Sequence, residues 1–405
     1  MINTCKTIGC PSFGVSDSKS YRFLDNDEVF CVECGYSFYL LDEFSFNNYI
    51  INSNVAVYKR LGYCGNCRSK GNLTNYGYSL SKKQRKKCNN CGSVFSIPSK
   101  FQVMSPMELD IKEIIHNGDS LVDYKKDYNV SSKVLGRYIK KINASSCLNY
   151  YEHNNHYLDI YTEVIKIKYN SSNNLLYVIF SCCLVTGKLI HLTTNYSPES
   201  ELGNELKYDG YGALNKKTIS IEEDITFKED EISSREKFFE INYGESSLKR
   251  NESGMIVKPV YSSYQHFEIL RRKLPSSKVI NHFIEHESFI YASCLSSFYS
   301  EVITNDCNIF YVKKRLGNSF EKSYLFHLDN YWKDSWRVFT TEKLDYALCG
   351  LTSPVVDKNN YPLLGKGFKE FLDEHPFHSQ LSKMNARNVT YILEVIAAQY
   401  NSKLE

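Results

Sequence analysis

Apolar residues recur at helical spacing in three short blocks in the segment 103–147. The first block, residues 105–117, opens with Ser-Pro, a capping residue followed by a proline suited to the first helical position, and Gly118 ends it. Residues 119–129 form a second short block, and residues 133–142 repeat apolar side chains every three or four positions. The pattern predicts three helices joined by short turns, the arrangement of a helix-turn-helix unit.

Further along the chain the pattern changes to stretches rich in Ile, Val and Tyr. Such stretches occupy residues 157–169, 175–184 and 188–194, and short polar connections separate them. These features predict a three-stranded antiparallel meander. The meander would open a large α/β domain at residues 155–405, in which residues 278–298 read as a strand followed by a helix.

Length and composition predict a folded protein of several domains. The chain has 405 residues, of which 42% are hydrophobic and 23% are charged. Residues 1–10 contain no apolar run of the kind found in secretion signals. The longest apolar stretch, residues 175–185, is far shorter than the about 20 residues of a membrane-spanning helix. We therefore expect a soluble cytoplasmic protein without a membrane partner.

Eight of the 14 cysteines form four close pairs in the first 91 residues. In a reducing compartment such pairing favours metal over disulfides, and two short knuckles supply the four thiolates that zinc requires. The pattern predicts a divergent first ribbon at residues 1–45, a second ribbon at residues 55–102 and two structural zinc ions. The expected ligands are Cys5, Cys10, Cys31 and Cys34 in the first ribbon and Cys64, Cys67, Cys88 and Cys91 in the second.

Positive charge is concentrated around the second ribbon. Residues 44–107 contain no acidic residue, whereas residues 1–43 carry seven acids and three bases. This asymmetry predicts phosphate contacts by the second ribbon and a packing or protein-contact role for the first. The third predicted helix also has a basic outer face. The expected DNA-binding residues are Lys82, Lys83, Arg85, Lys86 and Lys87 in the ribbon and Ser131, Ser132, Lys133, Arg137, Lys140 and Lys141 in the helix. The alternative to DNA binding is that the basic run forms a solvated hairpin and that the three helices form a linker with a solvated basic face.

The predicted meander, with an acidic residue early in its first strand, is how an RNase H-like domain begins. In that fold carboxylates hold two Mg²⁺ ions for phosphodiester chemistry. Asp159 is the candidate first ligand. Glu163 lies on the same face but about 13 Å further along the strand, too far to share a metal with Asp159. The alternative to this metal-binding role is that Asp159 is an ordinary surface acid at the end of a strand.

Two segments resemble insertion-element transposases that join a zinc ribbon, a helix-turn-helix and an RNase H-like domain with an Asp-Asp-Glu triad. They are GNLTNYGYSLSKKQRKKCNNCGSVFS after the first CxxC of the second ribbon, and NLLYVIFSCCLVTGKLIHLTT in the meander. The resemblance covers residues 60–195 well and the remainder loosely. It implies double-stranded DNA as partner, a homo-oligomer, a nucleoid-associated location, and Mg²⁺ if the protein is catalytically active.

The sequence departs from that family at the second and third carboxylates. The position matching the second Asp holds Glu285 or Glu287, with Asp306 as an alternative of poorer fit. Glu394 and Glu370 are the candidates for the third. The expected triad is therefore Asp159, Glu285 and Glu394.

Three functions follow from these patterns. The first is a sequence-specific DNA-binding transposase that cleaves and joins element ends with Mg²⁺. The second is a transcriptional regulator derived from such an enzyme, with an inactive catalytic site. The third is a zinc-ribbon protein associated with RNA or a protein complex. The acidic insertion at residues 199–258 reads as a solvated excursion or, alternatively, as a protein-contact arm.

Overall fold

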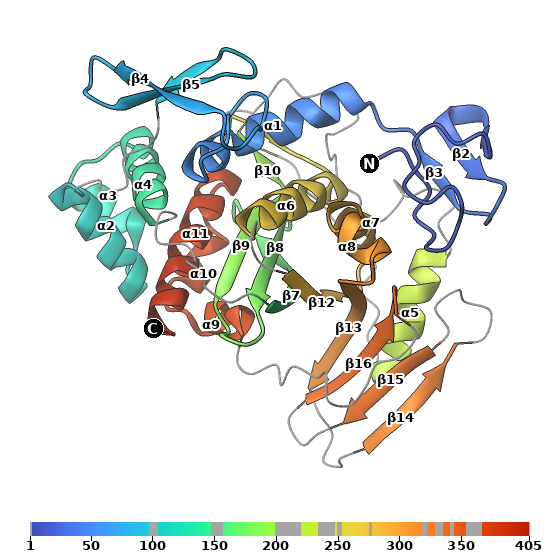
Figure 1. The fold of residues 1–405 in the computed structure, drawn as a ribbon. Coiled ribbons are helices and arrows are strands. Elements are labelled where there is room, and N and C mark those ends of the chain that lie inside the picture. The colour runs from blue at the N-terminus through green and yellow to red at the C-terminus, as the bar shows by residue number, and fades with distance from the viewer. Residues whose placement is uncertain are drawn as a thin grey trace.

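The structure, a computed structural model, describes most of the chain as a mixed α+β protein (Figure 1). Two cysteine clusters lie near the N-terminus, and a mixed sheet with helices forms the C-terminal region. Most of the acidic insertion lies outside the described residues. The described residues are 2–96, 104–146, 157–198, 220–233, 248, 253–274, 278–316, 322–328, 335–340, 344–353 and 367–404.

An eight-stranded sheet organises the C-terminal region. Its strand order is β14-β15-β16-β13-β12-β7-β8-β9. The predicted meander is confirmed, because β7 pairs antiparallel with β8, and β8 pairs antiparallel with β9. On its other side β7 pairs parallel with β12, and β12 pairs parallel with β13. The bounds are β7 Tyr157–Lys168, β8 Leu175–Cys183, β9 Leu189–Thr194, β12 Lys278–Glu285, β13 Asn308–Leu316, β14 Lys322–His327, β15 Ser335–Thr340 and β16 Leu344–Gly350.

Helices cover both faces of the sheet around β8. Tyr177 contacts Phe289 of α7, and Phe180 contacts Phe368 of α9 with ring centroids 5.1 Å apart. Side chains alternate along a strand, so two positions three residues apart point to opposite faces. Within the described residues, the helices of this region are α6 Pro259–Lys273, α7 Ser288–Ser297, α8 Tyr299–Ile303, α9 Phe368–Glu374, α10 His378–Leu381 and α11 Ala386–Lys403. Two short strands, β10 Tyr196–Ser197 and β11 Met255–Ile256, form a separate pair.

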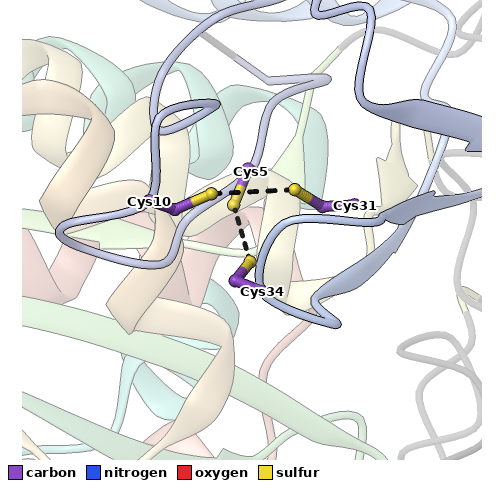
Figure 2. A group of neighbouring side chains, drawn as sticks. All are labelled: Cys5, Cys10, Cys31 and Cys34. Atoms are coloured by element: carbon purple, nitrogen blue, oxygen red, sulfur yellow. Dashed lines mark hydrogen bonds between the residues drawn. The ribbon is translucent and has the colours of Figure 1, made fainter.

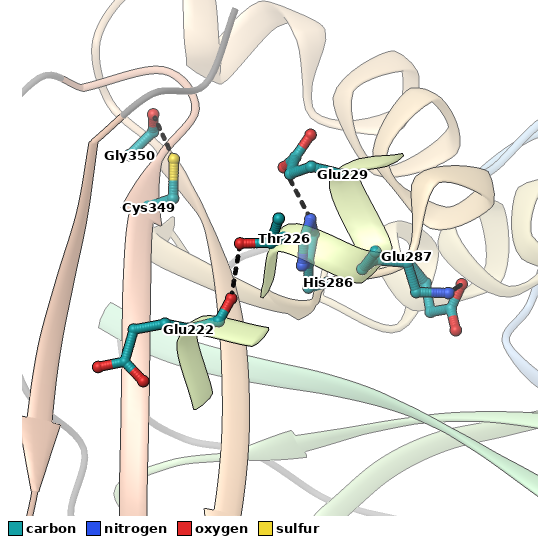
Figure 3. Close-up of polar contacts among 8 residues, drawn as sticks. Glu222, Thr226, Glu229, His286, Glu287, Cys349 and Gly350 are labelled. Atoms are coloured by element: carbon teal, nitrogen blue, oxygen red, sulfur yellow. Dashed lines mark hydrogen bonds and ion pairs between the residues drawn. The ribbon is translucent and has the colours of Figure 1, made fainter. Parts of the chain in front are cut away.

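The described part of the acidic insertion, helix α5 (Ile221–Ser233), packs against the sheet instead of standing in solvent. Figure 3 shows His286, just after β12, pointing at Glu229 of α5; the two side chains are 2.9 Å apart and buried. Lys228 forms an ion pair with Glu287 at 2.9 Å. The expectation of a solvated excursion is therefore wrong for this segment, because its acids and lysine have partners across the interface.

Three helices lie where the sequence pattern predicts them, namely α2 (Pro106–Asn117), α3 (Leu121–Asp127) and α4 (Ser132–Ser146). Ser105 and Glu108 form a capping box at the start of α2. Gly118 ends that helix with φ of 82°, in the left-handed region that favours glycine.

A helix that the sequence patterns did not predict, α1 (Glu43–Arg60), joins the two cysteine modules. It lies across α6, where the Tyr49 hydroxyl donates to Gln265 at 2.5 Å and the Phe46 ring packs edge-on against Tyr264. The segment escaped prediction because Asn and Ser interrupt its apolar residues; one of them, the buried Asn54, accepts a hydrogen bond from Gln265 of α6 at 3.1 Å. None of the described helices combines the length and the apolar character needed to cross a membrane.

The first cysteine module packs against the C-terminal region. The Phe13 ring lies 5.0 Å from that of Tyr299 in α8. Gly14, with φ of 69°, approaches Tyr299 so closely that a Cβ atom would lie 2.5 Å from the ring. Glycine is therefore required there by both the backbone conformation and the contact.

Candidate zinc sites and nucleic-acid interface

The four cysteines of the first module converge from two loops (Figure 2). The Sγ atoms of Cys5 and Cys34 are 3.5 Å apart, and those of Cys10 and Cys31 are 3.7 Å apart. A three-stranded sheet supports them, formed by β1 Tyr21–Phe23, β2 Glu28–Cys31 and β3 Ser37–Tyr39, with a short 3-10 turn at Asp25–Asp27.

The second module repeats this plan. The Sγ atoms of Cys64 and Cys91 are 3.6 Å apart, as are those of Cys67 and Cys88. Its sheet consists of β4 Leu73–Tyr78, β5 Gln84–Cys88 and β6 Val94–Ser96.

The geometry of both clusters fits tetrahedral zinc. With Zn–S bonds of about 2.3 Å, the edges of a tetrahedron of sulfur atoms are about 3.8 Å long. The observed separations approach this value and exceed the about 2.05 Å of a disulfide. Among the described residues, these two clusters are the only groups of three or more Cys, His, Asp or Glu ligand atoms within 4.8 Å of one another. The two four-cysteine groups could therefore hold two zinc ions, as the cysteine spacing predicted.

Local hydrogen bonds prepare the second cluster for thiolate ligands. The Ser93 hydroxyl lies 3.1 Å from the Cys91 sulfur and lowers the pKa of that thiol to about 5. The Ser69 hydroxyl likewise lowers the pKa of Cys88. Because the thiolate is the form that binds metal, both contacts favour the metal-bound state.

The β4–β5 hairpin presents the predicted basic residues of the second ribbon. Lys82, Lys83 and Lys87 are exposed, and Arg85 and Lys86 are half-buried. The Arg85 guanidinium and the Lys87 ammonium lie 5.5 Å and 5.7 Å from the ring centroid of Tyr76. Within the described part of the chain, none of these five cations has an acidic partner within 4.0 Å.

Helix α4 has three distinct faces. Leu135, Ile139 and Ile142 are buried on the side of α4 that packs with α2. A second face packs on α11, where Asn143 donates to the carboxylate of Glu394 at 2.7 Å. Gly136 lies against the same helix. The remaining face is exposed and basic; its residues are Lys133, Arg137 and Lys140.

Two predicted DNA-binding residues of α4 have structural partners. Lys141 forms an ion pair with the buried Glu108 of α2 at 3.2 Å, although about half of its side chain remains exposed. The Ser131 hydroxyl accepts a hydrogen bond from the Val134 backbone and so caps α4. Ser132 is exposed beside it.

The three predicted catalytic carboxylates do not come together. Asp159 of β7 is paired with Asn281 of β12, near the start of both strands. Its carboxylate accepts hydrogen bonds from the backbone and the side chain of Asn281. Glu285 ends β12, four residues beyond Asn281, which is about 13 Å at ordinary strand rise. Glu394 lies on α11 and contacts α4.

The carboxylate of β7 that lies near Glu285 is Glu163. Glu285 accepts a hydrogen bond from the Val164 backbone at 2.7 Å, and burial together with the charges of Glu163 and Glu287 raises its pKa to about 7. Glu163 itself forms an ion pair with Lys314 of β13 at 3.4 Å. Sequence reasoning set Glu163 aside because it lies about 13 Å along the strand from Asp159. The pairing that brings it near Glu285 joins distant segments and has no local sequence signal.

These residues do not fit a preformed Mg²⁺ site. Two-metal sites require several carboxylate oxygens around ions about 4 Å apart. Among the described residues no three carboxylates approach within 4.8 Å, and Glu163 is neutralised by Lys314. Among the described residues, the candidate carboxylates are therefore not gathered into one cluster.

No protein-family model matches the chain, and no curated protein sequence matches it.

Proposed function

We propose that the protein binds double-stranded DNA at specific sequences through α4 and the β4–β5 hairpin. It would act as a DNA-binding regulator with the architecture of an insertion-element transposase. The observation that supports this most directly is the exposed stripe of Lys133, Arg137 and Lys140. It occupies the one face of α4 that packs against neither the helix-turn-helix core nor α11.

A recognition helix inserted in the major groove requires such a free face. The hairpin cations would add contacts to phosphate, which strengthen binding without reading sequence. In the view of Figure 1, the hairpin and helices α2–α4 lie toward the same end of the molecule, and the first ribbon lies at the other. This placement agrees with a first ribbon that serves packing, as its contact with α8 indicates.

The strand order supports an RNase H-like origin for the C-terminal region. Strands β9-β8-β7-β12-β13 correspond to the order 3-2-1-4-5, with the second strand antiparallel to the others. In this interpretation β14, β15 and β16 extend the sheet beyond its fifth strand. The same topology favours a second candidate function, transposase-type cleavage and joining of DNA by a homo-oligomer, although the described carboxylates form no metal site.

The DNA-binding proposal predicts a charge-specific loss of affinity. Replacing Lys133 and Lys140 together with alanine should weaken binding to a selected duplex and reduce the slope of log K against log salt by about 2, since each phosphate contact contributes about one counterion. The measurement is fluorescence anisotropy over a salt series, with sites selected from genomic fragments. Lys19→Ala, an exposed lysine of the first ribbon, is the matched control and should leave both quantities unchanged. An unchanged slope in the double variant would contradict the proposal.

The two candidate functions separate in a nicking assay on supercoiled plasmids containing the selected site. A regulator should leave the plasmid intact in Mg²⁺ or Mn²⁺. A transposase should nick it, and Asp159→Asn or Glu163→Gln would show which carboxylate of β7 takes part. Selected fragments that converge on inverted ends flanking the protein's own gene would favour the transposase, whereas fragments upstream of unrelated genes would favour the regulator.

A further inference from the structure

The turn of the β4–β5 hairpin displays apolar side chains to solvent at the centre of the most basic part of the chain. Leu80 is fully exposed at 108% and Tyr78 is 70% exposed. Lys82 and Lys83 follow directly. Apolar side chains that lie together at one exposed tip, with cations beside them, are typical of a surface that contacts a ligand.

Hydrogen bonds hold this turn in one shape. The Lys82 and Ser79 backbones donate to the carbonyls of Ser79 and Lys83, both at 2.9 Å. The Ser79 hydroxyl accepts from the Lys83 backbone at 3.0 Å and lies 2.9 Å from the Ser81 hydroxyl. Leu80 therefore projects from a preformed turn, and a ligand that contacts it does not have to order the loop first.

The charge around the tip selects the class of ligand. Five cations of the hairpin have no acidic partner among the described residues, so the ligand is anionic. The apolar tip needs a flat or apolar surface in the same ligand. Unstacked nucleic-acid bases next to phosphates offer both, and aromatic and aliphatic side chains bind such bases by stacking or wedging.

We propose that the β4–β5 turn is a wedge that inserts Leu80 and Tyr78 among unstacked bases, so that the preferred ligand is duplex DNA interrupted by unpaired bases. This inference rests on the proposed DNA-binding function and refines its substrate class. Tyr76 has a different role: Arg85 and Lys87 lie over its ring, and it positions these cations toward the flanking phosphates.

The test uses the full-length, zinc-loaded protein and two labelled duplexes of the same sequence, one fully paired and one with a short central unpaired loop. The wild type should bind the looped duplex roughly tenfold more tightly, the size expected for stacking on one or two bases. Leu80→Ser and Tyr78→Ser should remove this preference while binding the paired duplex almost as well. A 2-aminopurine base in the loop should change its fluorescence with the wild type and not with Leu80→Ser.

Controls separate the wedge from charge and from folding. Val185→Ser replaces an apolar residue, about as exposed as Tyr78, in the turn between β8 and β9 and should keep the preference. Lys82→Ala with Lys83→Ala should weaken binding to both duplexes equally. Leu80→Met, which keeps an apolar side chain at the tip, should keep the preference, and zinc content should be the same in every variant.

Equal affinity of the wild type for both duplexes, or a preference that survives Leu80→Ser, would overturn the wedge. The second result is also what a hairpin that docks on a protein would produce. Failure to bind either duplex would instead overturn the proposed DNA-binding function. If binding depends on Lys133 and Lys140 but shows no preference for the looped duplex, the DNA-binding function is supported and only the wedge proposal is wrong.

Discussion

Replacing Cys88 with serine should release one of two zinc ions per chain and unfold the β4-β5-β6 sheet. The apolar core of this ribbon is very small: apart from its cysteines, only Phe95 is buried and Leu73 is partly buried against it. So small a core does not offset the conformational entropy of the segment. Metal binding therefore supplies the folding free energy, on the order of 10 kcal/mol for structural zinc.

Zinc content by metal analysis and hydrogen exchange of residues 64–96 measure this result. DNA binding should be lost together with the hairpin. Cys31→Ser in the first ribbon is the matched control, since it removes the other zinc and should spare DNA binding. Two zinc ions per chain in Cys88→Ser would contradict the assignment of Cys88 as a ligand.

Features with local sequence signals were predictable. The cysteine spacing identified both four-cysteine clusters because each pair of ligands comes from one tight turn. The capping residues and apolar spacing predicted α2, α3 and α4, and the alternation with short turns predicted the β7–β9 meander. In each case the signal itself is local, because a cysteine pair, a helix cap or a turn occupies only a few neighbouring residues.

Features that depend on distant pairing were not predictable. The register of β7 on β12 joins segments more than 100 residues apart, and it decides that Asp159 meets Asn281 while Glu163 lies near Glu285. Helix α5 looked solvated because its partners, His286 and Glu287, lie far along the chain. Likewise, only the fold shows that Glu394 contacts Asn143.

A buried polar network between the sheet and helices α6 and α7 also depends on distant contacts. His282 lies 2.9 Å from the Thr162 hydroxyl, and that hydroxyl lies 2.6 Å from Ser181. Ser181 in turn lies 2.8 Å from His266. His191 stacks on His266 with ring centroids 4.9 Å apart. All three histidines are buried, so their charged forms have little solvation.

This network should make the protein acid-sensitive. Burial lowers the pKa of His282 to about 3 and that of His191 and His266 well below the ordinary 6.5. The folded protein therefore keeps these rings neutral while the unfolded chain takes up protons below 6.5. Their contribution to stability is complete above pH 6.5 and falls as the pH is lowered toward 3. At pH 5, where the unfolded chain is largely protonated at these positions and His282 is still neutral, His282 alone lowers the stability by about 2 kcal/mol, and His191 and His266 act in the same direction.

Guanidinium unfolding at several pH values between 7 and 4 measures how the free energy of unfolding depends on pH. Hydrogen exchange of the amides in the central sheet shows whether the loss of stability includes that sheet. Removing one such histidine, in His266→Gln, should reduce the slope of the free energy of unfolding against pH by about 1.4 kcal/mol per pH unit, the value for one proton. Glutamine keeps an acceptor and a donor for Ser181 and Thr193, so the fold should survive. His327→Gln, at an exposed position of β14, is the matched control and should leave the slope unchanged. A wild-type slope in His266→Gln would mean that the acid sensitivity arises elsewhere, with thiolate protonation at the zinc clusters as the next candidate, because thiolates must also take up protons to release the metal.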